Sequence, residues 1–325
     1  MNLDRRSASL AVASFSLGLP LGLRSARAAD YPDRPIHAVI GFAAGSGADV
    51  FGRYYTHKLE QLAGVPVVVD NKPGASSNIA LRYVSDARPD GYTILLSASS
   101  NMAGSRFLYK SLPFDTMSDF RPVASFAEIG FVLVVSPKSK VNTLVELIAK
   151  LRGEKDALYG YSDQTALFTS ELFKQLAGVA AKPVAYKSSP DTMRDLTDET
   201  LDFVIMDGTF AAGQVNQGAV KAIAVNTSRR LPTFPDVPTF TEAGLNGFDF
   251  VTWKCMYVPK NTPQAVVDKL EGYMHQINRM PETEAFLKAS GALMLDDGPD
   301  RSNERLRADM PRWENLVKLA GIQPQ

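Results

Sequence analysis

Short apolar runs alternate along the chain with longer segments in which apolar residues recur at helical spacing. The run Ile36 to Phe42 is of strand length, and Val65 to Val69 and Tyr92 to Leu96 are similar. Between the first two runs, apolar residues repeat every three to four positions, at Val50, Phe51, Tyr54, Tyr55, Leu59 and Leu62. This alternation predicts an α/β fold with a mostly parallel sheet and helices on both of its faces.

The alternation restarts after about residue 128, which predicts a second α/β lobe. Phe131 to Val135 begins it as a buried strand, and Asn142-Thr143 caps a helix. A polar loop is expected from Tyr159 to Thr165. Further expected elements are strands at Val184 to Lys187, Phe203 to Met206, Val220 to Val225 and Phe250 to Val258, helices at Asp191 to Leu196 and Pro263 to Ile277, and two closing helical segments. We therefore expect residues 29–127 and 249–325 to form lobe I and residues 128–248 to form lobe II.

The first 28 residues have the pattern of an export signal. Arg5 and Arg6 supply positive charge, Ser7 to Leu23 is apolar, and Ala26-Arg27-Ala28 has the small-x-small pattern of a signal peptidase site. The alternative is an uncleaved anchor, although the apolar stretch is short for a span of ~20 residues. The paired arginines leave both general and twin-arginine export open. The signal predicts a periplasmic protein.

Composition excludes several classes of protein. Lys and Arg together number 35, as do Asp and Glu, so no basic excess points to nucleic acid. Cys255 is the single cysteine, which rules out an intramolecular disulfide and suits a small core residue. No later stretch is long and apolar enough to span a bilayer.

Catalytic and metal motifs are missing from the sequence. The three histidines, His37, His57 and His275, lack metal-ligand spacing, so we expect no metal site and structural or surface roles for them. The loop Gly41 to Asp49 matches neither a dinucleotide fingerprint nor a P-loop nor a nucleophile elbow. Asp49, Asp163 and Asp207 follow strands, where carboxylates serve either acid–base chemistry or helix capping. We expect no cofactor.

The glycine-rich stretch Gly41 to Asp49 joins the first strand to the first helix. It leaves the first helical N–H groups without intrahelical partners, and the helix dipole adds positive charge there. Gly45 and Gly47 have no Cβ, so a ligand can approach the backbone closely. The stretch is therefore either an ordinary strand–helix connection or a seat for a carboxylate.

Loops rich in small hydroxyl residues follow several other predicted strands. They are Ser76-Ser77-Asn78, Ser97 to Asn101, Ser162 to Thr165 and Lys187-Ser188-Ser189. Ligands of open α/β sheets bind beyond the carboxyl ends of the strands, where such loops converge. Ordinary helix caps would use the same residues, but their number in both lobes favours a polar cleft for anions.

Short motifs along the whole mature chain occur in the order and spacing that are typical of one protein family. They are Tyr31-Pro32-Asp33-Arg34-Pro35-Ile36, Gly41 to Asp49, Asn71-Lys72-Pro73-Gly74-Ala75, Asp90-Gly91-Tyr92-Thr93, Tyr186-Lys187, Pro235-Asp236-Val237-Pro238-Thr239, Glu242-Ala243-Gly244-Leu245, Trp253 and Ala320-Gly321-Ile322. In these motifs the chain resembles the substrate-binding proteins of tripartite tricarboxylate transporters, the Bug-type extracytoplasmic receptors.

The resemblance implies a type II periplasmic-binding fold with two lobes and a hinge crossed twice. It implies that loop backbone N–H groups and bridging waters hold ligand carboxylates, without an arginine clamp. It places Ser46 to Asp49 and Ser76 to Asn78 opposite Ser162 to Thr165 and Asp207. The chain departs from the family pattern in these loops. Gly41 and Ala44 replace prolines, Ser46, Ser76 and Ser77 replace glycines, and Tyr159 to Thr165 is about two residues short.

We therefore predict a monomeric extracytoplasmic receptor that binds a small organic acid and delivers it to membrane permease subunits or presents it to a sensor protein. The alternatives are a ligand-free interaction protein and an enzyme that uses loop Asp and Ser residues. We expect a monocarboxylate, or a dicarboxylate whose second group reaches Ser162 or Lys187. The predicted ligand-binding residues are Ser46, Gly47, Ala48, Asp49, Ser76, Ser77, Asn78, Ser100, Ser162, Asp163, Thr165, Lys187 and Asp207.

Overall fold

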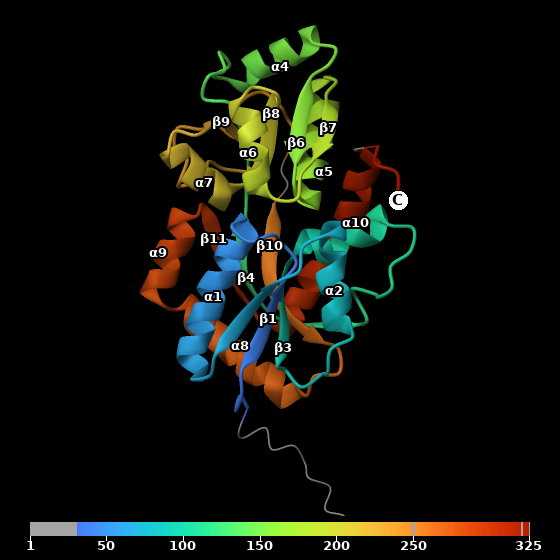
Figure 1. The fold of residues 1–325 in the computed structure, drawn as a ribbon, viewed down its shortest axis with the longest axis vertical. Helices are drawn as coiled ribbons and strands as arrows, with labels where there is room; N and C mark the ends of the chain where they lie inside the picture. Colours follow the sequence, from blue (N-terminus) through green and yellow to red (C-terminus); the bar gives the residue numbers. More distant parts are fainter. Residues whose placement is uncertain (1–30, 249–250, 320, 325) are drawn as a thin grey trace, which may run out of the picture.

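Two β-sheets organise the protein in a computed structural model that describes residues 31–248, 251–319 and 321–324 (Figure 1). The expected export signal at residues 1–28 lies outside the described residues. Helices flank both sheets, and the two sheets lie end to end along the long axis of the molecule (Figure 1).

The first sheet has six strands in the order β11-β4-β10-β3-β1-β2. Strands β1, β2 and β3 are parallel, whereas β10 runs antiparallel to both β3 and β4, and β11 runs antiparallel to β4. The strands are β1 (Ile36–Ile40), β2 (Val67–Asn71), β3 (Thr93–Ala98), β4 (Phe120–Ile129), β10 (Thr252–Pro259) and β11 (Ala292–Asp297). Its helices are α1 (Gly47–Ala63), the 3₁₀ turn η2 (Ala75–Ser77), α2 (Asn78–Ser85), the π-helical turn η3 (Ser100–Gly104), α3 (Ser105–Leu108), α8 (Gln264–Asn278), α9 (Pro281–Ala289) and α10 (Pro299–Leu319).

The second sheet has five strands in the order β7-β6-β8-β5-β9. Strand β5 is antiparallel to both of its neighbours, and β6 is parallel to β7 and β8. The strands are β5 (Phe131–Val135), β6 (Leu158–Tyr161), β7 (Lys182–Ala185), β8 (Phe203–Asp207) and β9 (Lys221–Val225), and the helices are α4 (Leu144–Gly153), α5 (Gln164–Ala177), α6 (Ser189–Thr197) and α7 (Gly208–Asn216).

Both sheets are mixed, so the expectation of a mostly parallel sheet is wrong. Strand β4 ends at Ile129 and β5 begins at Phe131, so one residue joins the two sheets. Strand β10 returns to the first sheet and pairs between β3 and β4. Strand β10 therefore runs against the parallel β1–β3 set, whereas β4 runs in the same direction as that set.

Several further elements differ from the sequence-based expectations. The expected polar loop Tyr159 to Thr165 contains the end of strand β6 and the start of helix α5. Strand β4 is absent from the expected elements because Arg121, Pro122 and Ser125 interrupt its apolar pattern. Strand β11, helix α7 and the η3–α3 segment are also additional, because each is short or lacks a clear apolar period.

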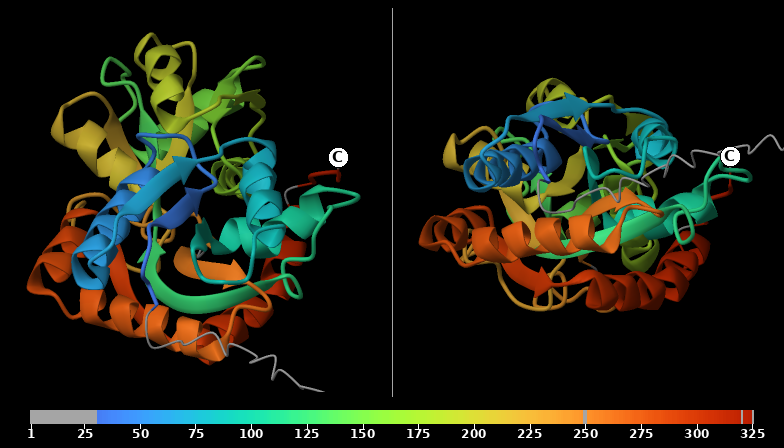
Figure 2. Two further views of the ribbon diagram at one scale, coloured as in Figure 1. Left: turned by 60° about the horizontal axis from the view of Figure 1, so that its bottom comes forward. Right: turned by 90° about the horizontal axis from the view of Figure 1, so that it is seen from below.

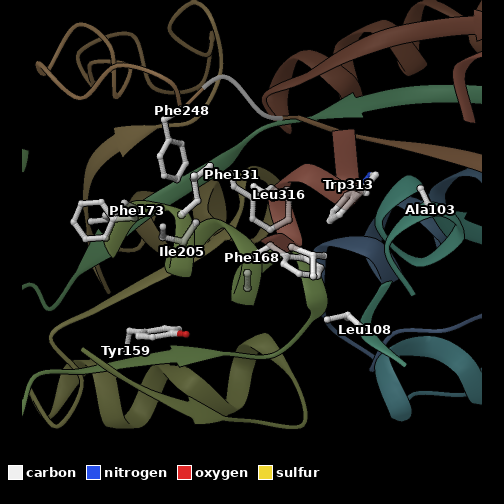
Figure 3. Close-up of a cluster of buried hydrophobic side chains, with 14 of the residues drawn as sticks. Ala103, Leu108, Phe131, Tyr159, Phe168, Phe173, Ile205, Phe248, Trp313 and Leu316 are labelled. Carbon is white, nitrogen blue, oxygen red and sulfur yellow. The ribbon is translucent and has the colours of Figure 1, made fainter. Parts of the chain in front are cut away.

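Three buried clusters fix the layers. Helices α1, α8 and α9 pack on one face of the first sheet, while α2, η3 and α10 cover the other face, as seen from below in Figure 2. In the second sheet α4 and α5 cover one face and α6 and α7 the other. One cluster continues from sheet to sheet, because Phe168 of α5 contacts Trp313 of α10 with ring centroids 5.3 Å apart (Figure 3).

Helix α1 begins where local chemistry supplies a cap. The Ser46 side chain accepts from the backbone N–H of Asp49, and the helix ends at Gly64, whose φ of 70° suits glycine. Its buried positions, which include Phe51, Tyr55 and Leu59, face the first sheet. None of the helices in the described ranges combines the length and apolarity that a membrane span needs.

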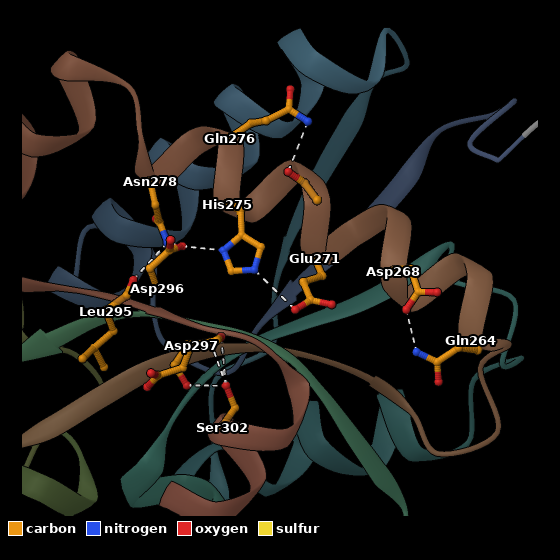
Figure 4. Close-up of polar contacts among 12 residues, drawn as sticks. Gln264, Asp268, Glu271, His275, Gln276, Asn278, Leu295, Asp296, Asp297 and Ser302 are labelled. Carbon is orange, nitrogen blue, oxygen red and sulfur yellow. Dashed lines mark hydrogen bonds and ion pairs between the residues drawn. The ribbon is translucent and has the colours of Figure 1, made fainter.

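His275 ties helix α8 to strand β11 (Figure 4). Its Nδ1 lies 2.6 Å from Asp296 Oδ1, and its Nε2 lies 3.3 Å from Glu271 Oε1. Asn278 Nδ2 also donates to Asp296 Oδ1 at 2.8 Å. Partial burial disfavours the charged imidazole, but the hydrogen bonds and charges of Asp296 and Glu271 outweigh it and raise the pKa of His275.

A histidine whose pKa rises on folding stabilises the folded state below the unfolded pKa of ~6.5, and the stabilisation is lost as pH rises through the folded pKa. We expect His275→Gln to lower the free energy of unfolding by about 0.5–1 kcal/mol at pH 5.5 and by less at pH 9. Urea titrations across that range measure this. His57→Gln is the control, because His57 contacts the neutral Gln61, and a pH-independent loss for His275→Gln would contradict the assignment.

Candidate functional site

A cavity of about 490 Å³ lies between the two sheets. Its walls come from the loops that follow β1, β2 and β3 on one side and from β6, α5, α6 and the end of β8 on the other. This volume is within the ~300–1,000 Å³ of small-molecule sites. The cavity therefore lies where chain segments distant in sequence converge.

The structure brings ten of the thirteen predicted residues to this cavity. They are Ser46, Ala48, Ser76, Ser77, Ser100, Ser162, Asp163, Thr165, Lys187 and Asp207. Gly47, Asp49 and Asn78 do not line it. Whether a ligand contacts these residues remains a prediction.

Asp49 supports the first loop from outside the cavity lining. Its carboxylate accepts from the Gly45 backbone N–H at 2.9 Å and from Asn71 Nδ2 at 2.8 Å, and it pairs with Arg53 Nε at 2.9 Å. Burial opposes ionisation, but these partners together lower the pKa of Asp49. Asp49 is therefore an ionised loop support that faces away from the cavity lining.

Gly47, the first residue of α1, meets a carboxylate of the chain itself. Its backbone N–H interacts with Asp207, which stands at the end of β8 in the opposite sheet. A Cβ added at Gly47 would lie 1.8 Å from Asp207 Oδ1. Only glycine leaves room for this approach, so the predicted carboxylate seat at the α1 N-terminus holds Asp207.

Asp163 and Asp207 cap the helices that follow them. Asp163 accepts from the Ala166 N–H at 3.0 Å, and Asp207 Oδ1 accepts from the N–H groups of Thr209 and Phe210 at 3.1 and 3.0 Å. Burial is the main cause that raises the pKa of each carboxyl, and these backbone donors oppose it. The two groups also repel each other, which raises the pKa of Asp163 further.

The loop before α2 has an uncommon backbone. Ala75, Ser76 and Ser77 have φ angles of 44°, 55° and 71°, in the left-handed region that non-glycine residues rarely adopt. Each such residue costs on the order of 1 kcal/mol or more. Ser77 Oγ donates to Gly41 O at 2.8 Å, and Asn101 Nδ2 donates to Ser76 O at 3.1 Å, so cross-links to neighbouring loops hold this conformation.

On the opposite wall, Ser162 and Ser189 join the starts of two loops. Their hydroxyl oxygens are 3.0 Å apart. Gln164 extends from α5 across to the first sheet, where its Nε2 donates to Ser105 Oγ at 3.0 Å and to Ser76 O at 3.3 Å. The cavity floor is thus cross-linked from both sheets.

Sequence reasoning missed Lys254 and several other lining residues, and it included Phe42, Asn101 and Gln164 within candidate loops without naming them as ligand-binding residues. Lys254 lies in the central strand β10 and is 8% exposed. Burial lowers the pKa of Lys254, and the negative charges of Asp207 and Asp163 partly oppose this. A lysine inside the apolar run Val251 to Val258 was a usable signal, because lysines are rarely buried without function or partner. Throughout the described ranges, no three or more His, Cys, Asp or Glu side chains gather to hold a metal.

Comparisons with known proteins agree on one family. The sequence model described as "Tripartite tricarboxylate transporter family receptor" matches residues 52–322. A UPF0065 protein of Bordetella bronchiseptica is 30% identical, over 94% of this chain and 91% of that protein. Protein BugT of Bordetella pertussis is 29% identical, over 99% of both chains.

Solved structures show the same fold. The periplasmic binding protein BugD superposes with a TM-score of 0.86 at 30% identity, over 91% of this chain and 100% of that one. The R. palustris protein Rpa4515, solved with adipate, gives 0.88 at 29% identity, over 91% and 100%. MatC from Rhodopseudomonas palustris, with bound malate, gives 0.83 at 25% identity, over 88% and 100%. The predicted α/β periplasmic-binding fold is thus confirmed.

The Ser77 backbone strain and its neighbour Gly41 generate a test. A Cβ at Gly41 would lie 2.6 Å from Ser77 Cβ, so we expect Gly41→Ala to destabilise the protein by about 1–3 kcal/mol. Ser77→Gly in the same chain removes the clash and the positive-φ strain, and should restore much of this loss. A double-mutant cycle by urea unfolding measures the coupling.

Gly213→Ala is the control for this cycle, because nothing lies within 4 Å of its added Cβ. That change should be neutral or slightly stabilising. Additive effects of Gly41→Ala and Ser77→Gly would show that the two positions are not coupled.

Proposed function

The chain belongs to the tripartite tricarboxylate transporter receptor family, and we propose that it is an extracytoplasmic receptor that binds one small organic acid in the cavity between its sheets. One observation carries this proposal. The cavity is lined from both sheets by hydroxyl groups and a buried ammonium, in a chain whose solved relatives hold adipate and malate.

The chemistry of the cavity wall favours binding over bond breaking. Asp163 and Asp207, the carboxylates best placed for acid–base work, are engaged by backbone N–H groups at helix starts. Ser46 and Ser77 donate to backbone oxygens, and Ser162 bonds to Ser189. Ser188 Oγ donates to Asp191 Oδ2 at 2.7 Å and also accepts from the Asp191 N–H, so this serine–carboxylate pair caps the start of α6.

We propose that the two sheets belong to lobes that close on the ligand. Lobe I would comprise residues 29–127 and 249–325, and lobe II residues 128–248. The single residue between Ile129 and Phe131, and the return into β10, would form the hinge. The contact of Gly47 with Asp207 joins the proposed lobes directly beside the cavity.

We further propose that the acid passes from this receptor to permease subunits of a tripartite transporter in the membrane. The family description supports this partner. We propose that the export signal is cleaved after Ala28. The intact mass of protein from the native envelope would test this, because it should correspond to a chain that starts at Ala29. BugD, the related structure, is a periplasmic binding protein, which supports the same compartment for this chain.

The proposal predicts that freshly purified protein carries or takes up a small organic acid. Native mass spectrometry should show a bound species at a few hundred daltons or less, and adding the identified acid should raise the unfolding temperature. Absence of any bound species, together with no stabilisation by a broad set of mono- and dicarboxylates, would favour a ligand-free interaction protein. Conversion of the bound acid during incubation would favour an enzyme.

Replacing Gly47 by valine should weaken binding while the fold stays intact. The added side chain would occupy the position of the Asp207 carboxylate and prevent close approach of the proposed lobes. The steric clash with Asp207 should disfavour the closed arrangement of the proposed lobes, so affinity should fall at least about tenfold, which is ~1.4 kcal/mol. Small-angle scattering should show a larger radius of gyration for the unliganded variant than for the parent.

Gly153→Val serves as the control, because an added Cβ at Gly153 meets nothing within 4 Å. Parent-like affinity and radius of gyration in Gly47→Val would remove the Gly47–Asp207 contact from the closing mechanism.

A further inference from the structure

The side chain of Lys254 is buried and lines the cavity, but the contacts described so far give it no structural role. Its neighbours Trp253 and Cys255 point into one core cluster, while Lys254 lies on the other face, at the cavity end of β10. Opposite it, β4 bulges, because Lys254 pairs with Ala127 and Cys255 with Ser125. Bulges of this kind re-aim side chains beside functional sites.

The ammonium of Lys254 has no hydrogen bond or ion pair to any residue in the part of the chain described. Its recorded neighbours are the Phe42 ring, whose centroid is 5.0 Å from Nζ, and the more distant charges of Asp163 and Asp207. Those carboxylates already accept backbone N–H groups. Three N–H donors on a buried cation are therefore available inside the cavity, and an unpaired buried charge is costly.

Asp207 already occupies the α1 N-terminus, where the sequence predicted that a ligand carboxylate would bind. It lies between the N-termini of α7 and α1, each of which carries roughly half a positive charge. The N–H groups at these two ends oppose the burial that raises the pKa of Asp207. A ligand anion at α1 would therefore meet Asp207, which leaves Lys254 as the buried lysine of the described wall that can bind it.

The buried ionisable groups of the wall favour a ligand with one carboxylate. Lys254 lies near Asp163 and Asp207, whose charges act on its pKa. One ligand carboxylate at Lys254 gains a cationic partner, whereas a second carboxylate beside it would face these two acidic groups. Lys187 is exposed at the rim, where solvent and the nearby Asp191 weaken its attraction for a second carboxylate.

Among the described wall residues two buried polar atoms lack a partner, Asn101 Oδ1 and Gln164 Oε1, and both are acceptors. Asn101 is 1% exposed and lines the cavity, and its Oδ1 has no hydrogen-bond partner although its Nδ2 is bonded to Ser76 O. Buried acceptors require donors. The Asn101 oxygen is closed to solvent, so a ligand hydroxyl or ammonium would bond to it after a small rotation of the side chain, whereas a second carboxylate offers no donor.

We propose that Lys254 Nζ binds the ligand carboxylate directly, and that the site selects monocarboxylates whose other polar groups are hydrogen-bond donors. This inference rests on the proposed function and specifies its ligand class. It assigns selectivity to a side chain on a strand, in addition to the loop backbones that the family resemblance implies.

The test compares four sets of acids, each from three to eight carbons long: unsubstituted, hydroxy, amino and dicarboxylic. Calorimetric titration of the parent protein should show tightest binding among the hydroxy or amino acids, and the two arms distinguish a hydroxyl from an ammonium donor. Lys254→Met keeps the length of the side chain without its charge. It should weaken the best acid by about 10- to 100-fold, as expected for a lost charged hydrogen bond.

Stability separates this role from a structural one. Removal of a buried charge that lacks a partner should leave the urea midpoint of unliganded Lys254→Met unchanged or raised. Lys254→Arg should keep part of the affinity, because it retains the charge. Lys288→Met, an exposed lysine outside the cavity lining, is the matched control and should bind as the parent does.

The outcomes are distinct. A parent that prefers dicarboxylates, or a Lys254→Met variant with parent affinity, would overturn the inference and leave the proposed function standing. If no acid in any set binds the parent, both the inference about Lys254 and the proposed function are wrong. The preference among the four sets of acids is measured on the parent protein alone. The inference can therefore be tested even if the Lys254→Met variant does not fold.

Discussion

The geometry of the cavity depends on one carboxylate held between two helices of different sheets. Asp207 caps α7, to which β8 leads, and its other contact is the first N–H of α1. Two positive helix ends face this group and favour its anion, but burial outweighs them and raises the pKa of Asp207. The absence of a side chain at Gly47 is the steric condition for this arrangement. The contact joins loops of both sheets beside the cavity, where the buried Lys254 also lies.

The antiparallel strands β4 and β10 place that ammonium. Because one residue separates β4 from β5, the end of β4 is fixed beside the cavity. Strand β10 pairs with β4 through two register shifts, one at Lys254 and Cys255 and one at Met256 and Tyr257. Ser302 of α10 donates to or accepts from Ser125 at the first shift, which supports the irregular backbone from the far face. The mixed topology therefore positions a side chain that a uniformly parallel sheet would not present.

Sequence patterns predicted those parts of the fold whose signal is local. Strand β1, helix α1 and its Ser46 cap are visible because apolar spacing and capping chemistry lie within a few residues. Strand β4 was not visible, because Pro122 occupies a bulge whose existence depends on a partner more than a hundred residues away. For the site, loop composition indicated ten lining residues. It could not show that Asp207 would reach Gly47, since that contact exists only once two separate sheets are packed.

The same difference between local signals and long-range contacts explains why the sequence did not predict which charged groups line the site. A search for cations within Gly41 to Asp49 finds none, which suggests a seat built from backbone N–H groups alone. Folding adds Asp207 to that seat and brings Lys254 from a strand roughly two hundred residues later. Related receptors are solved with the dicarboxylates adipate and malate. A shared fold fixes where an acid binds, whereas the number of its charges depends on the few buried ionic groups at the site. Among the described residues of this cavity, those buried groups are the carboxyls of Asp163 and Asp207, each facing at least one helix N-terminus, and the amine of Lys254, which has no hydrogen-bond or ion-pair partner there. This arrangement is the basis on which we propose a ligand with a single negative charge.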